Sequence, residues 1–399
     1  MNALVVILDG VSDRGTVTPL STARTPNFDK LARASVCGLM YSIGRGVLPG
    51  SDTSHLAIFG YDPNQYYKGR GTYEALGAGM SMSHGEVAFR VNLATVDDGL
   101  VVVDRRAGRD PYLMDKMFQE MDGLRIEDVT VNLKHTVEHR GAMTLSGPGL
   151  SHLVTNADPH ETGAKVREVE ALAPEASRTA RNMTEFTRLS DEKLSRCEAN
   201  LKRAEKGLKS ANIMLARGAG YFEKVEPFEK RFGMKAVCVA AGALYRGVAR
   251  YVGMDLVDVP GATGTTETNL AAKARACLDA RALYQFIFCH IKGTDACGHD
   301  GQFDKKKAFI ERVDAEFVSL VEGKFDVIIF TGDHSTPVTT KRHSADPTPF
   351  VFYHADCRAD DCRRFTEADC AHGGLGVLQG IHVVPLVQDY LDVAHMFGE

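Results

Sequence analysis

The sequence predicts a doubly wound α/β fold with a mostly parallel sheet. Short apolar runs of strand type, at residues 3–8, 235–241, 284–291 and 325–330, alternate with helical patterns such as residues 268–280 and 303–322. Strands that alternate with helices form βαβ units, which build parallel sheets with helices on both faces. Because ligands of such folds bind at the carboxyl ends of the strands, polar residues that follow these runs are the first candidates for a functional site.

The middle of the chain has a different pattern, and it predicts an insertion. The chain has 399 residues, which suggests about two domains of roughly 100–200 residues each. Apolar and polar residues alternate at residues 86–93 and 129–133, as in half-exposed strands, and residues 167–208 have helical spacing. We expect a core formed by residues 1–84 and 216–399, with an α+β cap domain inserted at residues 85–215. The charged stretch 178–209 is interpreted as a solvated helix face.

Composition narrows the class of protein. With 44% hydrophobic and 25% charged residues, the chain has the composition of a soluble globular protein. Its formal charge of −5 favours neither a nucleic-acid nor a membrane partner. The N-terminal residues 1–10 are interpreted as a buried strand and not as a signal peptide, and no apolar stretch approaches the ~20 residues of a membrane span. We therefore expect a cytoplasmic protein.

The cysteines agree with this expectation. Their number, nine, is odd, and in a chain of this length it favours reduced thiols over a disulfide framework. Cys357 and Cys362 fit the loose end of a zinc-site spacing, but Cys370 and His372 do not complete a second pair. No zinc site is predicted there.

Carboxylate and imidazole side chains gather in the polar segments that follow the apolar runs. They are Asp9, Asp295 with His299, and Asp333-His334 with His343. Such side chains are ligands of zinc, manganese and magnesium. Asp295 and His299 are four residues apart and can reach one ion. Asp333 and His334 either serve two ions, if the backbone is extended, or one ion, if it turns. Together these side chains suffice for two metal ions.

Ser51 is the candidate nucleophile. Gly50 allows a sharp turn before it, and the helix that follows offers free N–H groups to a phosphate. Two metal ions suit phosphoryl transfer, and a serine bound to one of them loses its proton more easily. Taken alone, Ser51 is an N-cap candidate, Asp9 a turn residue, and His55 a second-shell partner or a core histidine. Their joint occurrence favours phosphoryl transfer.

Several longer motifs carry a resemblance to a known family. They are LDGVSDRG, ARTPNFDKLA, PGSDTSHLAIFGYDP, YKGRGTYEALGAG, DRRAGR, VPGATG, HIKGTDACGHDG, TGDHSTPVTTKRHSADPTPF and GGLGVLQGIHVVPLV. With them the sequence resembles the cofactor-independent phosphoglycerate mutases of archaeal type, in the alkaline phosphatase superfamily. The resemblance extends nearly end to end and is weakest in residues 111–210. It implies an alkaline-phosphatase-like core with an inserted cap, and interconversion of 3- and 2-phosphoglycerate without a bisphosphoglycerate primer.

The resemblance also implies residue roles. Ser51 becomes phosphoserine, and two divalent ions (Mn²⁺, Mg²⁺, Co²⁺ or Zn²⁺) bind beside it; the sequence does not select among them and leaves the oligomeric state open. One ion is held by Asp9, Ser51, Asp333 and His334, and the other by Asp295, His299 and His343. The cap excludes water, so that the phosphoryl group returns to the glycerate. The candidates for binding the substrate are Asp104, Arg105, Arg109, Arg140, Arg217 and Lys292.

One departure and two alternatives accompany the resemblance. Arg246 stands where the family often has lysine, which keeps the charge but changes the shape. A phosphatase, or another phosphotransferase such as a homoserine kinase, would use the same core, although the chain has no G-x-x-x-x-G-K-[ST] loop. A metal-binding scaffold without catalysis would require a broken site, whereas the serine and all the Asp/His candidates are present.

Overall fold

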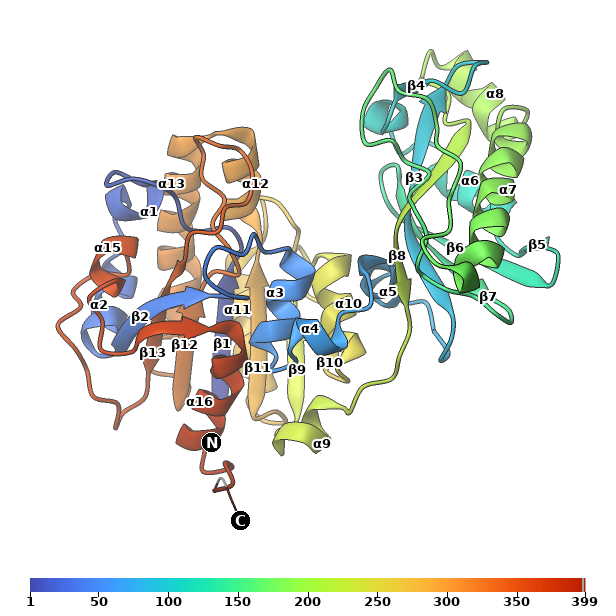
Figure 1. Ribbon diagram of the computed structural model, residues 1–399. Helices are drawn as coiled ribbons and strands as arrows, with labels where there is room; N and C mark the ends of the chain where they lie inside the picture. The colour runs from blue at the N-terminus through green and yellow to red at the C-terminus, as the bar shows by residue number, and fades with distance from the viewer. Residues whose placement is uncertain (397, 399) are drawn as a thin grey trace. The chain divides into compact units, whose positions relative to one another are not determined.

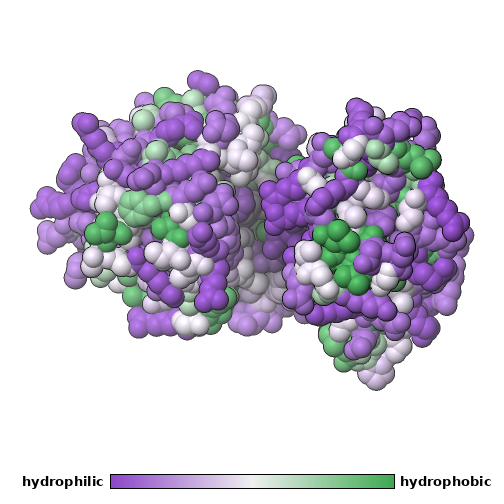
Figure 2. Space-filling view, turned by 90° about the horizontal axis from the view of Figure 1, so that it is seen from above, coloured by the Kyte–Doolittle hydropathy of each residue, from purple (hydrophilic) through white to green (hydrophobic). Residues whose placement is uncertain are grey.

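The computed structural model describes residues 1–396 and 398 of the chain. The chain forms two compact units: the first combines Met1–Tyr67 with Val225–Glu399, and the second is Lys68–Lys224 (Figure 1). On the face that Figure 2 shows, the surface of both units is mostly hydrophilic, and apolar residues form small groups. Among the described residues, no helix combines the length and the apolar character that crossing a bilayer requires.

The first unit is built on an eight-stranded sheet of order β10-β9-β11-β1-β12-β13-β2-β14. Strand β1 lies between β11 and β12 and is parallel to both, while β13 is antiparallel to its two neighbours. Every residue of β1 and β11 is buried, as expected for parallel strands covered on both faces. The predicted doubly wound, mostly parallel sheet is confirmed. The strands are β1 (Ala3–Leu8), β2 (Val36–Tyr41), β9 (Ala236–Val239), β10 (Asp255–Val257), β11 (Phe286–Ile291), β12 (Val327–Thr331), β13 (Thr348–Tyr353) and β14 (Gly376–Gln379).

Helices cover both faces of this sheet. On one face, Leu4 and Val6 of β1 share a core with Phe309 and Ile310 of α13. On the other face, Phe59, which follows α3, packs edge-on against Phe288 of β11 with ring centroids 4.7 Å apart. The helices are α1 (Pro19–Thr22), α2 (Pro26–Arg33), α3 (Ser51–Ile58), α4 (Pro63–Tyr66), α9 (Phe228–Phe232), α10 (Ala243–Tyr251), α11 (Leu270–Ala280), α12 (Gly293–Asp300), α13 (Phe303–Val313), α14 (Ser319–Val321), α15 (Glu367–Cys370) and α16 (Val383–Tyr390), with a π-helical turn η3 (Asp314–Val318) and a 3₁₀ turn η4 (Gly380–His382).

The second unit is an antiparallel α+β domain. Its strands run β4-β3-β7-β6-β5, and β8 pairs with β3. Phe118 of α6 and Phe186 of α7 pack with Val91 of β3 and Met143 of β7 in a separate core. The elements are β3 (Val87–Val96), β4 (Val102–Asp104), β5 (Leu124–Ile126), β6 (Val129–Val137), β7 (Arg140–Ser146), β8 (Ile213–Tyr221), α5 (Arg70–Gly77), α6 (Met114–Met121), α7 (Ser177–Leu194), α8 (Glu198–Glu205), η1 (Ala107–Arg109) and η2 (Pro174–Ala176).

The inserted unit is longer than the expected segment 85–215. Helix α5 packs on β3 and β8, and a Cβ on Gly71 would lie only 2.0 Å from the Ala88 carbonyl oxygen. Strand β8 continues to Tyr221, whose backbone N–H donates to the Lys68 carbonyl at 2.9 Å. Residues 68–84 and 216–224 therefore belong to the second unit. The helical pattern of residues 70–77 does not show on which sheet that helix packs.

Candidate active site

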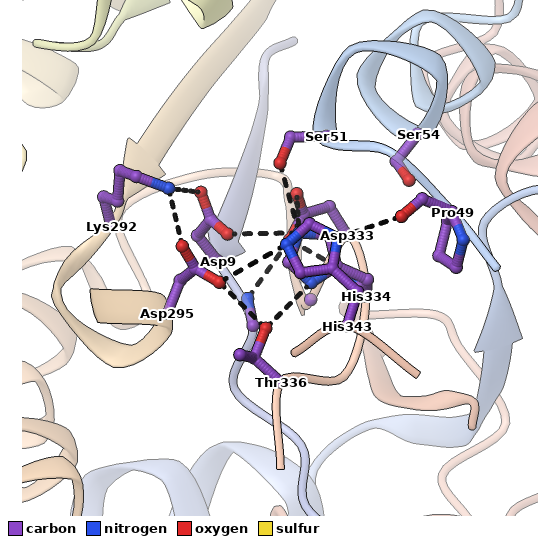
Figure 3. A network of polar contacts seen from close by, with 12 residues as sticks. Asp9, Pro49, Ser51, Ser54, Lys292, Asp295, Asp333, His334, Thr336 and His343 are labelled. Atoms are coloured by element: carbon purple, nitrogen blue, oxygen red, sulfur yellow. Dashed lines mark hydrogen bonds and ion pairs between the residues drawn. The ribbon is translucent and has the colours of Figure 1, made fainter. Parts of the chain in front are cut away.

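Three neighbouring strands deliver the candidate ligands to one edge of the large sheet. Asp9 follows β1, Asp295 lies in α12 just after β11, and Asp333 and His334 follow β12. Because β1 is parallel to both β11 and β12, their carboxyl ends meet, and the side chains point toward one another (Figure 3). Ser51, the first residue of α3, reaches the same place.

The side chains of Ser51, Asp9 and Asp333 converge around the imidazole of His334. Its Nε2 lies 3.2 Å from Ser51 Oγ, 3.2 Å from Asp333 Oδ2 and 3.4 Å from Asp9 Oδ1. All four side chains belong to buried residues. Within the described part of the chain, Asp9 Oδ1 and Asp333 Oδ2 have no hydrogen-bond partner. A buried carboxylate oxygen without a partner is costly, and a cation between these atoms would satisfy both. The residues therefore fit a divalent metal ion.

A second group of ligand atoms adjoins the first. Donor atoms of Asp295, His299 and His343 lie within 4.8 Å of one another. His299 Nε2 is 3.3 Å and His343 Nε2 is 3.8 Å from Asp295 Oδ1. The His343 ring stacks on that of His334 with centroids 3.6 Å apart. The structure thus brings all seven sequence-predicted metal ligands together; their assignment as ligands stays a prediction.

Hydrogen bonding fixes which nitrogen of His334 carries its proton. The Thr336 hydroxyl donates to Asp295 Oδ1 at 2.8 Å, and a hydroxyl has one hydrogen to give. His334 Nδ1 lies 3.1 Å from the hydroxyl oxygen Oγ1 of Thr336 and must therefore donate its hydrogen to that oxygen. Burial lowers the pKa of His334 to about 3, so the ring is neutral and the lone pair lies on Nε2. Nε2 faces the two unpartnered carboxylate oxygens, as a metal ligand would.

The other two histidines follow the same rule. His343 Nδ1 donates to the Pro49 carbonyl and His299 Nδ1 donates to the Lys341 carbonyl, each at 3.0 Å. A carbonyl oxygen only accepts, so each Nδ1 carries a hydrogen, and Nε2 is the nitrogen of each ring that faces Asp295. Backbone contacts thus prepare both rings as Nε2 ligands.

We expect Thr336→Val to weaken metal binding by about 10- to 100-fold, because the hydroxyl that orients His334 and Asp295 is lost. Isothermal titration of metal-free protein with Mn²⁺ measures this change. Thr336→Ser keeps the hydroxyl and serves as the matched control. Equal affinities in the valine and serine variants would contradict the orienting role.

The charges of the site are not balanced. Lys292 Nζ donates to Asp9 Oδ2 at 3.1 Å and to Asp295 Oδ2 at 2.8 Å. Burial alone would raise the pKa of Asp9, but Lys292 and His290 hold it well below its usual value. Burial, and then the carboxylates of Asp9 and Asp295, raise the pKa of Asp333 well above its ordinary value. One ammonium against three clustered carboxylates leaves a deficit that divalent cations would fill.

Two neighbours of this cluster, Tyr245 and His290, escaped prediction. Tyr245 in α10 donates its hydroxyl to Asp9 Oδ2 at 2.5 Å, and His290 Nε2 lies 2.9 Å from the same oxygen. The only signal for His290 is its place at the end of an apolar run. His55 is fully buried, and its Nδ1 donates to the Ser51 carbonyl at 2.6 Å, so it braces the first turn of α3. Arg246, the departure from the family pattern, pairs with Asp258 at 2.8 Å.

The second unit gathers arginines around two buried residues. Arg105 binds Asp158 through Nε (3.3 Å) and Nη2 (2.8 Å), and Arg217 Nη1 is 3.6 Å from the same carboxylate. Burial, and then the nearby charges of Arg140, Arg90, Arg109 and Arg217, lower the pKa of His139 to about 4. The predicted arginines thus share one electropositive region. No sequence signal had indicated that Asp158 and His139 belong to it.

Asp104 is in a different situation. Its carboxylate accepts hydrogen bonds from Lys209 Nζ at 2.6 Å and from the Arg106 backbone at 2.8 Å. Its predicted contact with a substrate hydroxyl would have to compete with these partners and stays a prediction.

The fold and the donor set together define a class: α/β enzymes with Asp and His metal ligands at the carboxyl edge of the sheet and a serine at a helix N-terminus. Comparison with known proteins narrows this class. A family model described as 2,3-bisphosphoglycerate-independent phosphoglycerate mutase matches residues 32–200. The chain belongs to this family, because it is 43% identical over 404 residues to 2,3-bisphosphoglycerate-independent phosphoglycerate mutase 1 of Methanocaldococcus jannaschii, covering 99% of this chain and 98% of that one.

Other relatives agree. The 2,3-bisphosphoglycerate-independent phosphoglycerate mutase 1 of Archaeoglobus fulgidus is 43% identical over 411 residues, covering 100% of this chain and 100% of that one. The solved structure of a cofactor-independent phosphoglycerate mutase from Thermoplasma acidophilum matches with a TM-score of 0.70 and 32% identity, covering 98% of this chain and 100% of that one. The PH0037 protein from Pyrococcus horikoshii matches with a TM-score of 0.85 and 35% identity, covering 100% and 99%.

Proposed function

We propose that this chain interconverts 3-phosphoglycerate and 2-phosphoglycerate through a phosphoserine at Ser51, with no bisphosphoglycerate primer. Membership of the mutase family supports the reaction. The role of Ser51 rests on the position of its Oγ, which lies 3.2 Å from His334 Nε2. At the same edge of the sheet, Asp9 Oδ1 and Asp333 Oδ2 have no hydrogen-bond partner among the described residues. We place this glycolytic activity in the cytoplasm.

Two divalent ions, Mn²⁺, Mg²⁺, Co²⁺ or Zn²⁺, complete the proposed site. Asp9, Ser51, Asp333 and His334 would hold one ion, and Asp295, His299 and His343 the other; carboxylate oxygens and imidazole nitrogens suit all four metals. When bound, the ions neutralise phosphate charge and lower the pKa of the serine hydroxyl.

Ser51 carries the covalent chemistry in this proposal. Its Oγ forms a bond to phosphorus while the bond from phosphorus to the glycerate oxygen breaks. The serine hydroxyl loses one proton and the released glycerate oxygen takes one up, so charge is conserved. The neighbouring glycerate hydroxyl then reverses the step and restores Ser51. The N–H groups of the first turn of α3, which His55 braces through the Ser51 carbonyl, favour the phosphoryl oxygens.

Binding of the glycerate anion falls, in this proposal, to Arg105, Arg109, Arg140 and Arg217, with Asp104 for a hydroxyl and Lys292 for the phosphate. Arginine pairs with carboxylate and phosphate in a bidentate geometry. Arg140 Nε is buried and has no hydrogen-bond partner in the part of the chain that the structure describes, so it is a donor ready for an anion.

We expect Arg217→Met to raise KM for 3-phosphoglycerate by about 10- to 100-fold, because one charge-assisted hydrogen bond to the anion is lost. Steady-state kinetics measure the change. Arg188→Met is the control on the same unit, since the Arg188 side chain is 59% exposed and pairs with Glu185 and Glu192. An unchanged KM in Arg217→Met would remove this residue from the proposed set.

An enolase-coupled assay tests the proposed function. Metal-free protein supplied with Mn²⁺ or Co²⁺, and no primer, should convert 3-phosphoglycerate to 2-phosphoglycerate. Release of inorganic phosphate instead would indicate a phosphatase, and ATP-dependent phosphorylation of homoserine would indicate a kinase. Absence of mutase activity with every metal of the series would overturn the proposal.

A further inference from the structure

Three cysteines and one aspartate lie close together in the unit that contains the large sheet. None of them belongs to the proposed active site. Cys37 lies in β2, while Asp360, Cys362 and Cys370 belong to the connection from β13 to β14. Donor atoms of Cys37, Asp360 and Cys362 lie within 4.8 Å of one another. Cys370 adjoins this group, since interactions with Cys362 and Cys37 are the first causes that raise the pKa of its thiol. The three cysteines are at most 4% exposed.

Backbone contacts hold the carboxylate of Asp360 against these thiols. Its Oδ2 accepts the N–H groups of Cys37 and Gly374, each at 2.7 Å, and its Oδ1 accepts the N–H of Cys362 at 3.0 Å. A carboxylate has about four lone-pair positions, so one on Oδ1 stays available. The same hydrogen bonds fix the backbone of two of the three cysteines. The metal-binding side chains are therefore held in position before an ion binds.

The connection that carries this cluster is long and irregular. Residues 354–375 connect β13 to β14, and the helix within them, α15, is four residues long. Connections of this length with little secondary structure are uncommon, and ordering them costs conformational entropy. A link from Cys362 and Cys370 to Cys37 would anchor the connection to β2.

We propose that Cys37, Cys362, Cys370 and Asp360 bind one structural Zn²⁺ ion. Three thiolates and one carboxylate make the closed four-ligand shell of a structural zinc site. Sulfur ligands select zinc over magnesium and manganese, whereas the proposed active-site ligands offer only oxygen and nitrogen. On binding, three S–H bonds break, three bonds from sulfur to zinc form, and three protons pass to solvent, so the affinity rises with pH.

The spacing of Cys357 and Cys362 with Cys370 and His372 did not predict a zinc site. Cys357 Sγ faces the Ala34 carbonyl at 3.6 Å, and His372 is exposed; neither belongs to the cluster. Their place is taken by Cys37, which is 323 residues from Asp360 in the chain. Pairing of β13 with β2 brings the two segments together.

Cobalt substitution tests the site on the whole protein. Reduced, metal-free protein titrated with Co²⁺ should develop a near-ultraviolet charge-transfer band from sulfur to cobalt, which the oxygen and nitrogen ligands proposed for the active site cannot give. At saturation the intensity of the band should correspond to one sulfur-bound ion per chain, and the band should disappear when Zn²⁺ is added. Cys37→Ser, Cys362→Ser and Cys370→Ser should lose the band while circular dichroism shows that they are folded.

Two variants serve as matched controls. Cys357→Ser removes a thiol of the same connection, and Cys277→Ser removes a buried thiol that contacts Cys289 without a carboxylate. Both should keep the band. Its absence from the folded wild-type protein would overturn the proposal whether or not the serine variants fold. A disulfide between Cys362 and Cys370 in metal-free protein isolated without reductant, combined with no cobalt band after reduction, would replace the zinc site with a redox pair.

Discussion

Replacing Ser51 with alanine should lower mutase turnover by at least about 10⁴-fold and abolish the phosphoenzyme, because the proposed mechanism passes the phosphoryl group through Ser51 Oγ. Ser51 Oγ is the hydroxyl that lies 3.2 Å from His334 Nε2. The enolase-coupled assay measures turnover, and mass spectrometry of protein quenched during turnover detects the phosphoryl group on the peptide that contains residue 51. Alanine suits the first helical position, so the fold should be retained.

Ser54 provides the matched control in the same helix. Figure 3 shows Ser54 near Ser51. Ser54 is fully buried, and its hydroxyl pairs with that of Ser42 at 2.9 Å. Ser54→Ala therefore removes a buried helical hydroxyl close to Ser51 and should lower stability with little loss of turnover. If Ser51→Ala kept its turnover, or if the phosphoryl group appeared on another residue, the proposed mechanism would be wrong.

Replacing Asp333 with asparagine should reduce turnover by at least about 10²- to 10³-fold and remove one bound metal ion per chain. Asp333 Oδ1 accepts the N–H groups of Gly10 (3.2 Å) and His334 (3.1 Å), and an amide oxygen can keep both contacts. The amide nitrogen would take the place of Oδ2, 3.2 Å from His334 Nε2, and would donate to the lone pair that a metal needs. The substitution thus disables two ligands with almost no change of shape.

The stability of the metal-free variant separates this effect from unfolding. Because burial and the carboxylates of Asp9 and Asp295 raise the pKa of Asp333, a neutral amide relieves repulsion there. Metal-free Asp333→Asn should unfold at the same or a higher temperature than metal-free wild type. Differential scanning calorimetry measures this, and inductively coupled plasma analysis counts the bound metal.

Asp314→Asn is the control for burying an amide in place of a carboxylate. Asp314 accepts the Phe28 N–H at 2.7 Å at the start of α2, away from the cluster. This variant should lose stability and keep both its metal and its turnover per folded molecule. A full complement of metal in Asp333→Asn would contradict the proposed ligand set.

The amino-acid sequence predicts the sheet and the sheet edge at which the candidate ligands gather. The apolar runs of β1, β11 and β12 lack alternation because both of their faces are buried, and this local feature is visible in any one segment. Asp9, Asp295 and Asp333 follow these runs directly, so their meeting follows from the parallel arrangement. Ser51 was visible through the glycine before it and the helix after it.

Only the tertiary structure decided the contacts that depend on strand order and side-chain direction. Thr336 fixes the tautomer of His334, and Tyr245 reaches Asp9 from a helix far away in the sequence. The helical pattern of α5 could not show that it packs on β3 and β8 in the inserted unit. Cys37 joins Cys362 through the pairing of β2 with β13. Local sequence patterns record how each segment buries its apolar face, but not which distant segment covers that face, because that choice is made by packing of the whole chain.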